Sequence, residues 1–358
     1  MKSVREADLK DKKVLLRADF DIPVHEGQIA EKFRIEKQKE TLDYLIENGA
    51  KVVIAAHISA LDSFASLLPQ LHLILGREIN FLKDVDGIGD YLDNYSGPAL
   101  LDNIRRFPGE KENDDKFALR LADGFDLYVN NAFAVCHRNH ASVSAITGHL
   151  PAYAGLLLEE EIRELDKAIK TPSQGKIIIM GGAKASTKIP AIKNFLDKAD
   201  KILIGGVIAN DILKERGADV GESVVDDDPG EILKGLDLDS PKLIMPNDFN
   251  VFENKILDIG DRAIEDYKLI IGGAGMIIWN GPMGMFEKPS FEKGTFEIAK
   301  AIAASAGYKI IGGGDTIAAI EKSGLSGKFD FISTGGGAML AFLAGDILPG
   351  LKVLGFYD

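Results

Sequence analysis

The sequence predicts an α/β protein with two doubly wound domains whose sheets are mostly parallel. Short apolar runs alternate with amphipathic helical patterns along the whole chain, which is typical of parallel strands covered by helices on both faces. The 358 residues are enough for two domains, each with its own core. In the second half, glycines recur just after apolar runs, where an open α/β sheet binds its ligands.

The first half contains four predicted strands and two clear helices. The strands are the apolar runs at 12–20, 51–57, 98–103 and 126–133. The helices are the periodic segments 36–49 and 116–124, each ending at a glycine. A longer segment, 152–170, is expected to form a helix that joins the two domains, followed by the polar link 171–175.

The second half repeats the pattern with more strands. We expect strands within 176–180, 201–206, 242–246, 276–282, 309–314 and 329–337. The helices include 187–197, 294–305 and 315–324. Pro190 is compatible with the first of these only because it falls in the first turn.

Composition and charge exclude several classes of protein. The net charge of −13 argues against nucleic-acid binding. No apolar run approaches the roughly 18–20 residues of a membrane span, and the first residues contain no apolar signal-peptide core. The single cysteine, Cys136, allows no internal disulfide, so a cytoplasmic location is expected. We interpret this cysteine as a small packed residue rather than a nucleophile.

The segment 176–190 is a candidate phosphate site. Its predicted strand ends at Gly181 and Gly182, which permit a tight turn and close approach to a ligand. Lys184 and Lys188 then come near the start of a helix, where free N–H groups favour an anion. From this segment alone, two surface lysines after an ordinary turn explain the pattern about equally well.

Glycine-rich turns follow five predicted strands in the second half, and together they predict a nucleotide site. The pattern is neither a P-loop nor a dinucleotide fingerprint. No acidic residue follows the strand at 201–206 to hold a nicotinamide ribose, so a dehydrogenase is disfavoured. Asp315 begins a predicted helix, where it would either cap backbone N–H groups or hold Mg²⁺ beside phosphates. The turns lie at 181–182, 205–206, 281–284, 312–314 and 335–337.

The first half carries a second candidate site, built from cations near strand ends. Arginine forks bind carboxylates and phosphates in a bidentate manner, so several of them in one domain predict an anion pocket. The candidate residues are Arg17, Arg34, His57, Arg105, Arg106, His137, Arg138 and His140.

Seven motifs together resemble the phosphoglycerate kinase family. They are LLRADFDIP, DNIRRF, NAFAVCHRNHAS, GGAKASTKI, IWNGPMGMFE, IIGGGDT and ISTGGGAMLAFL, and they occur in the family's order along nearly the whole chain. The resemblance implies reversible phosphoryl transfer from 1,3-bisphosphoglycerate to Mg-ADP, giving 3-phosphoglycerate and ATP. It also implies two domains joined by a helix and a hinge around a central cleft, and a monomer with small-molecule partners only.

The resemblance assigns the domains and the functional residues. It implies a glycerate-binding domain at 1–168, a nucleotide-binding domain at 169–345, and a final segment at 346–358 that packs back on the first domain. The implied catalytic residues are Arg34, Lys184, Lys188, Gly336 and Gly337. The implied substrate-binding residues are Asp19, Phe20, Asp21, Arg34, His57, Arg105 and Arg138. The implied nucleotide-binding residues are Gly182, Lys188, Gly205, Gly206, Asn280, Glu287, Gly313, Gly314, Asp315 and Thr316, with Asp315 also on Mg²⁺.

Two positions depart from the family pattern in the first domain. Ala60 stands where the family has an arginine that contacts the substrate, and Asp21 replaces the usual asparagine. The nucleotide motifs are intact, so the departures concern the acceptor. Three alternatives remain at this point: a phosphoglycerate kinase in which Arg106 replaces the missing arginine, a related kinase with a different acceptor or weak activity, and a nucleotide-binding homologue without catalysis.

Overall fold

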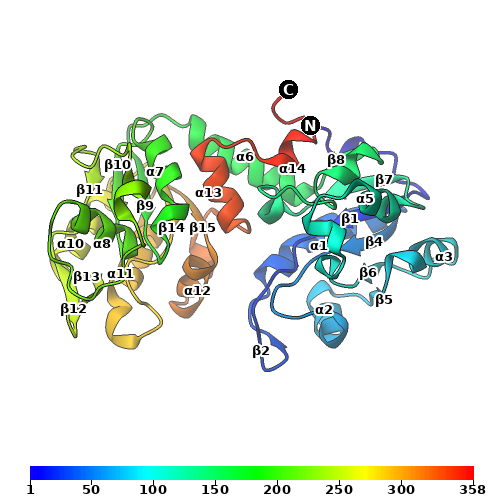
Figure 1. Ribbon diagram of the computed structural model, residues 1–358, viewed down its shortest axis with the longest axis horizontal. Coiled ribbons are helices and arrows are strands. Elements are labelled where there is room, and N and C mark those ends of the chain that lie inside the picture. Colours follow the sequence, from blue (N-terminus) through cyan, green and yellow to red (C-terminus); the bar gives the residue numbers. More distant parts are fainter. The chain divides into compact units, whose positions relative to one another are not determined.

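Two units make up the computed structural model, which describes residues 1–358 (Figure 1). Unit 1 comprises Met1–Ile162 and Ile347–Asp358, and unit 2 comprises Arg163–Asp346. The first division lies inside helix α6 (Leu156–Lys170), six residues before the expected boundary at residue 168. The last twelve residues belong to unit 1, where the backbone N–H of Gly350 donates to the carbonyl of Cys136 at 2.9 Å.

Unit 1 is built on a six-stranded parallel sheet in the order β5-β6-β4-β1-β7-β8. Its central strands β1 and β4 are apolar apart from charged residues at their ends and are buried after the first residue, as expected for strands covered on both faces. The strands are β1 (Lys13–Arg17), β4 (Lys51–Ala55), β5 (Asn80–Leu82), β6 (Ala99–Leu101), β7 (Leu127–Asn130) and β8 (Ala152–Ala154).

Side chains of β1 alternate between two cores, one on each face of this sheet. Val14 and Leu16 pack with α1 (Phe33–Glu47) and α2 (Leu68–Leu75). Leu15 packs on the opposite face with α3 (Ile88–Asp93) and α5 (Asp115–Ala122). Helices therefore cover both faces of the sheet, which confirms the predicted doubly wound arrangement for this unit. Smaller elements are the hairpin β2 (Val24–His25) and β3 (Gln28–Ile29), and helices α4 (Pro108–Lys111) and α14 (Pro349–Lys352).

Unit 2 repeats the design with the parallel order β11-β10-β9-β14-β15-β16. The odd-numbered residues of β9 and β14 pack against α10 (Asp261–Gly272) and α11 (Lys293–Ala304). On the other side, α7 (Ile189–Phe195) and α13 (Gly336–Ala344) contact each other, and the amide of Asn194 donates to the carbonyl of Leu343 at 2.6 Å (Figure 1).

The remaining elements of unit 2 frame these layers. The strands are β9 (Lys176–Met180), β10 (Lys201–Ile204), β11 (Leu243–Ile244), β14 (Met276–Asn280), β15 (Tyr308–Gly312) and β16 (Phe331–Ser333). The antiparallel hairpin β12 (Phe249–Phe252) and β13 (Lys255–Ile259) lies outside the main sheet. The other helices are α8 (Gly206–Glu215), α9 (Pro229–Leu233) and α12 (Gly314–Lys322).

Several element boundaries differ from those expected. Segment 152–170 is not one helix: it begins as strand β8, and α6 starts after Gly155. Gly155 has no room for a side chain because Asn131 occupies that space. The helix expected at 187–197 is shorter, since 185–187 form a 3-10 turn and α7 begins at Ile189, with Pro190 in its first turn. None of the helices is both long and apolar enough to cross a bilayer.

Candidate active site

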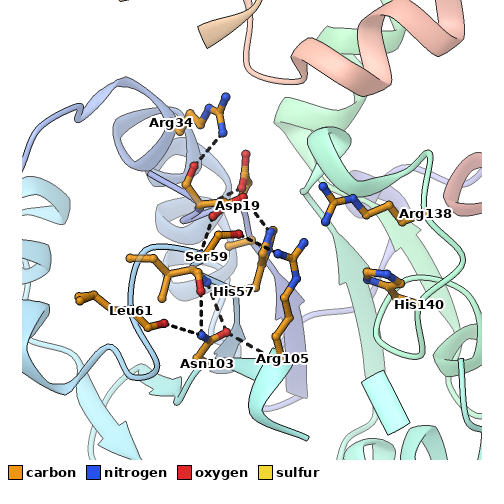
Figure 2. A network of polar contacts seen from close by, with 12 residues as sticks. Asp19, Arg34, His57, Ser59, Leu61, Asn103, Arg105, Arg138 and His140 are labelled. Atoms are coloured by element: carbon orange, nitrogen blue, oxygen red, sulfur yellow. Dashed lines mark hydrogen bonds and ion pairs between the residues drawn. The ribbon is translucent and has the colours of Figure 1, made fainter. Parts of the chain in front are cut away.

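In unit 1, the predicted anion-binding side chains gather at the carboxyl edge of the sheet. Asp19 follows β1, His57 follows β4, Arg105 lies in the 3-10 turn after β6, and Arg138 lies in the loop after β7. These four strands are neighbours in the sheet, so their ends meet at one edge. Arg34, from the first turn of α1, points toward the same group (Figure 2).

The loop 19–21 connects the parts of this site. The backbone N–H of Asp21 donates to the Asp19 carboxylate at 3.1 Å, and Arg34 donates to the Asp21 carbonyl at 2.7 Å. The Asp21 carboxylate accepts from the backbone N–H of Ser59 at 2.7 Å. Phe20 is buried and its ring packs edge-on against Phe64, so its side chain belongs to the core. Only its backbone is left for a ligand.

Asn103 is a positioning residue that the sequence did not single out. Its buried side-chain amide donates to the carbonyls of Ile58 at 2.8 Å and Leu61 at 3.0 Å, and its side-chain oxygen accepts from the backbone of Ile58 and Arg105 (Figure 2). Asn103 therefore fixes the loop after β4 against the turn that carries Arg105. An asparagine at the N-cap of a turn, in the DNIRRF motif, was the available signal.

Arginines 105 and 106 have different surroundings. Arg105 donates to the Ser59 hydroxyl at 2.8 Å, while its Nε and the other terminal nitrogen are buried without a partner. Arg106 instead forms an ion pair with the buried Asp102. Asp102 also accepts from the backbone of Phe64 and Asn103, so this pair has a structural role. Arg106 is thus not a free substitute for the arginine missing at Ala60.

The unpartnered polar atoms of unit 1 indicate the chemistry of the ligand. Buried nitrogens without partners remain on Arg34, His57, Arg105 and His140, and one oxygen of Asp19 has none either. Arginine only donates, so its natural partner is an anion. Asp19 only accepts when ionised, so it suits a hydroxyl. The set therefore matches a small anionic ligand that also carries a hydroxyl group.

Burial and neighbouring cations keep the histidines of this site neutral. Burial, and then the Arg138 charge, lower the pKa of His140 to about 4. Burial also lowers the pKa of His57 and of His137. Cys136 is buried, and desolvation raises the pKa of its thiol to about 12, which agrees with a packed residue rather than a nucleophile.

In unit 2, five glycine turns follow the adjacent strands β10, β9, β14, β15 and β16 at one edge of the sheet. Gly206 shows why glycine is needed there. Its φ is +58°, and a Cβ would lie 2.5 Å from the backbone nitrogen of Gly182. The turns after β9 and β10 therefore touch through their backbones. The N–H groups of Gly182 and Gly206 donate to the carbonyls of Pro282 and Met283, so these turns are fixed by hydrogen bonds within the protein.

The two lysines of the segment 176–190 lie in different surroundings. Lys188 is 8% exposed and donates to the carbonyl of Lys184 at 3.4 Å, while Lys184 itself is exposed. The Lys188 ammonium lies over the turn at Gly182, 3.3 Å from the position of a Cβ there. Burial lowers the pKa of Lys188, and the Asp315 and Asp226 carboxylates oppose that shift. The turn is also held by a hydrogen bond from the Ser186 backbone to Asp226 at 3.0 Å.

Two residues of the IIGGGDT motif have different roles: Thr316 is structural, and Asp315 faces the space for a ligand. The buried Thr316 hydroxyl accepts from the backbone of Gly281 at 2.7 Å, so it joins the turns after β14 and β15. Asp315 is exposed in the first turn of α12. Asn280 is buried with its side-chain nitrogen unpartnered, 3.1 Å from the position of a Cβ on Gly313. Asn280 therefore points a free donor at the glycine turn.

A cavity of about 190 Å³ opens beside these turns in unit 2. Its walls are mostly apolar, and three carboxylates, Asp258, Glu287 and Asp315, lie among them. Such a cavity suits a flat base with a polar sugar and phosphates at one end. Other wall residues are Gly182, Gly206, Val207, Val224, Phe249 and Met283.

Asp258 lies in the wall of this cavity and was not foreseen. It is 2% exposed, and its carboxylate accepts from the backbone of Gly294 at 2.7 Å and of Ile259 at 2.9 Å. Asp258 thus connects β13 to the first turn of α11. Desolvation raises the pKa of this carboxyl to about 7, against the two backbone hydrogen bonds.

No cluster of three or more His, Cys, Asp or Glu side chains forms a protein-only metal site. Asp315 is an isolated carboxylate beside the glycine turns. Mg²⁺ is commonly bound by one or two carboxylates together with substrate phosphates. The residues present therefore fit a magnesium ion that arrives with a nucleotide.

Comparisons with known proteins agree along the whole chain. A model of the phosphoglycerate kinase family matches residues 4–346. This chain belongs to the phosphoglycerate kinase family. It is 39% identical to the phosphoglycerate kinase of Rubrobacter xylanophilus, over 99% of this chain and 98% of the relative. It is 40% identical to that of Thermosipho africanus, over 98% and 96%.

Solved structures give the same result at the level of the fold. The phosphoglycerate kinase of Pyrococcus horikoshii superimposes with a TM-score of 0.90 at 32% identity, covering 99% of this chain and 98% of that one. The enzyme from Coxiella burnetii gives 0.83 at 32% identity, with the same coverage. Family membership makes the chain a phosphotransferase with a carboxyl group as acceptor, and its two parallel-sheet α/β units match those structures.

Proposed function

We propose that the chain transfers the acyl phosphate of 1,3-bisphosphoglycerate reversibly to Mg-ADP, with unit 1 binding the glycerate and unit 2 the nucleotide. The observation that carries this proposal is the family match across residues 4–346. The separate chemistry of the two edges supports it: unpartnered cationic donors in unit 1, and glycine turns beside an apolar cavity in unit 2.

In unit 1, the proposed ligand is the phosphoglycerate. His57, Arg105 and Arg138 bind its phosphate. His57 and Arg105 have buried donors without protein partners, which are stabilised most by an anion, and Arg138 adds a third cationic side chain at the same edge. The free oxygen of Asp19 accepts from the hydroxyl group of the glycerate and so orients it. Asp21 contributes its backbone and lies at the same edge.

In unit 2, the proposed ligand is the nucleotide. The base occupies the apolar cavity, and Glu287 binds the ribose. The turns at Gly182 and Gly205–Gly206 let the phosphates come close to the backbone, and the turn at Gly313–Gly314 donates to them. Asn280 supplies its free donor at the same turn, and Thr316 holds that turn in shape. Asp315 is the proposed ligand of the metal that accompanies the nucleotide, and this metal would neutralise phosphate charge.

Transfer requires no protein nucleophile. The bond between phosphorus and the carboxylate oxygen breaks while a bond to the terminal oxygen of ADP forms, and the carboxylate of 3-phosphoglycerate leaves. Arg34, Lys184 and Lys188 stabilise the charge on the moving group, and the first N–H groups of α13, at Gly336 and Gly337, donate to it. The proposal includes closure of the two units to exclude water and bring the ligands together.

The proposal also includes location and assembly. A single, buried, unreactive cysteine suits a reducing cytoplasm. We propose a monomer, because each candidate ligand set is complete within one unit of one chain. Size-exclusion chromatography with light scattering tests the assembly, and a dimer mass would contradict it.

A steady-state assay with Mg-ATP and 3-phosphoglycerate, coupled to detection of the acyl phosphate, tests the activity. Lys188→Ala is expected to lower turnover by orders of magnitude. The control Lys198→Ala removes an exposed lysine just after α7 and is expected to leave turnover unchanged. Magnesium-dependent nucleotide binding without turnover would mean that the acceptor is another carboxylate.

A further inference from the structure

Arg17, at the end of β1, is a cation at the carboxyl edge of the unit 1 sheet that no ligand can reach. It is 0% exposed, and protein atoms occupy its donors. Nε donates to the Ser142 hydroxyl at 2.8 Å, one terminal nitrogen donates to the Ala18 carbonyl at 2.5 Å, and the other lies 3.4 Å from Nδ1 of His57. The Ser142 hydroxyl in turn donates to the buried carboxylate of Glu110 at 2.7 Å. Among the hydrogen-bond partners of Arg17, His57 is the one that belongs to the proposed ligand site; the charge of Arg17 also lowers the pKa of His140.

The contact between Arg17 and His57 determines which imidazole nitrogen carries the proton. A guanidinium has only donors, so Nδ1 of His57 must accept and cannot be protonated. The proton of the neutral ring is then on Nε2. A doubly protonated ring would direct an N–H at the guanidinium and lose this hydrogen bond.

On the other side of the ring, Nε2 of His57 lies 3.1 Å from Oδ2 of Asp21. The contact is short but poorly aligned, so Nε2 does not have a fully formed hydrogen bond. The other oxygen of Asp21 is taken by the backbone N–H of Ser59 at 2.7 Å. The carboxylate is therefore held against the wall of the site, and the Nε2–H remains available for a better acceptor.

The charges around His57 come from several elements. Arg17 from β1 disfavours the imidazolium, while Asp19 and Asp21 from the following loop favour it. Arg105 from the turn after β6 and His140 from the loop after β7 lie at the same edge. Burial is the largest influence and, with Arg17, lowers the pKa of His57 despite the two carboxylates. His57 itself lowers the pKa of Asp21, which stays ionised although burial opposes this.

We propose that Arg17 and Asp21 are positioning residues for His57: Arg17 fixes the ring as the Nε2–H tautomer, and Asp21 holds that N–H as an internal anion until a phosphate of the substrate displaces it. The second half of this proposal rests on the proposed function. This role also explains why a carboxylate lies within an anion-binding site. One oxygen of Asp21 competes with the ligand for the Nε2–H of His57, and the other accepts from the backbone N–H of Ser59.

The first half is tested on the wild-type protein without any ligand, by ¹⁵N NMR of the histidine rings across pH 6–8. His72 is an internal reference, because its Nε2 lies 2.9 Å from the carbonyl of Ile79 and must donate to it. His57, assigned through His57→Asn, is expected to show the same Nε2–H pattern at pH 8, and less imidazolium at pH 6 than a free histidine, because burial lowers its pKa. A neutral ring that carries its proton on Nδ1 would overturn the role of Arg17.

The second half is tested by adding 3-phosphoglycerate to the wild type and to Asp21→Asn. The Nε2–H resonance of His57 is expected to shift on binding. Asp21→Asn is expected to bind 3-phosphoglycerate about tenfold more tightly, because a neutral acceptor competes less strongly for a donor than a charged one. Weaker binding by this variant would overturn the role of Asp21 as competitor and make it a direct ligand of the substrate.

The outcomes separate this inference from the function on which its second half rests. If the wild type shows the Nε2–H tautomer but does not bind 3-phosphoglycerate, the proposed substrate and the displacement step are both refuted, and the role of Arg17 stands. In Arg17→Gln, His57 is expected to populate both tautomers. The wild-type spectrum decides the question even if that variant does not fold.

Discussion

Replacing Arg34 with alanine is expected to abolish most of the activity while leaving the fold intact. The Arg34 side chain is 20% exposed and makes one hydrogen bond, at 2.7 Å, to the carbonyl of Asp21. Its Nε makes no hydrogen bond and has only a long ion-pair contact, at 4.0 Å, with the carboxylate of Glu31. In the free protein, the variant therefore loses one hydrogen bond from a charged donor, which contributes about 1.5 kcal/mol, the lower end of the range for charged groups, because the side chain is partly exposed.

The expected loss in the transition state is larger. An arginine that neutralises a moving phosphoryl group is worth about 10³-fold or more in kcat. That factor corresponds to about 4 kcal/mol, well above the stability change. Arg34→Lys is the matched variant: it keeps the charge but not the planar fork, so it should recover only part of the rate.

Two measurements on the same preparations separate these effects. Urea unfolding reports the stability, and the coupled assay at saturating Mg-ATP and 3-phosphoglycerate reports kcat. A well-folded Arg34→Ala protein with near-wild-type kcat would refute the role of Arg34 in the transfer. A loss of activity that merely follows a loss of folded protein would refute the claim that its role in stability is minor.

Three further changes have outcomes set by the geometry. The pKa of Asp258 is raised in the folded state to about 7, so the native protein binds more protons than the unfolded chain between about pH 4 and 7. This carboxyl therefore lowers the free energy of unfolding as pH rises, by at most about 1.4 kcal/mol per pH unit. Asp258→Asn should flatten that slope when unfolding by denaturant is measured across this pH range. Gly206→Ala should destabilise unit 2 far more than Gly217→Ala. Both glycines have positive φ, but a Cβ has open space only at Gly217. Equal melting temperatures of the two variants would contradict the close approach of Gly206 to Gly182. Ala60→Arg, an exposed change beside the loop that meets Arg105, should lower the KM for 3-phosphoglycerate, and a higher KM would show that the site has no room for a further cation.

The sequence predicted the fold well because its strong signals are periodic and local. Runs such as 177–180 and 276–279 are apolar at every position, which leaves little alternative to central parallel strands. The grouping of site residues followed from topology, since adjacent parallel strands end at one edge. Strand β8 was missed because three residues are too few to show a period, and the helix after it was therefore started too early.

What the sequence could not give was the partner of each polar group. Arg17 and Arg105 both lie near strand ends, but only the structure shows that the first is enclosed by protein acceptors and the second has free donors. Arg106 was expected to be available, yet Asp102 four residues earlier takes it. Such pairings depend on side-chain directions within loops, which no spacing rule fixes.

Unit 1 is discontinuous, and this has a consequence for synthesis on the ribosome. Residues 347–358 belong to it, with Leu351 fully buried and Gly350 bound to Cys136. At about 5–20 residues per second, all of unit 2 must be translated before these residues appear, a delay on the order of ten seconds or more. Unit 2 is contiguous and is therefore the first to have all of its contacts available. During that interval, the nascent unit 1 exposes the apolar surface that α14 later covers, and chaperones have most opportunity to bind there.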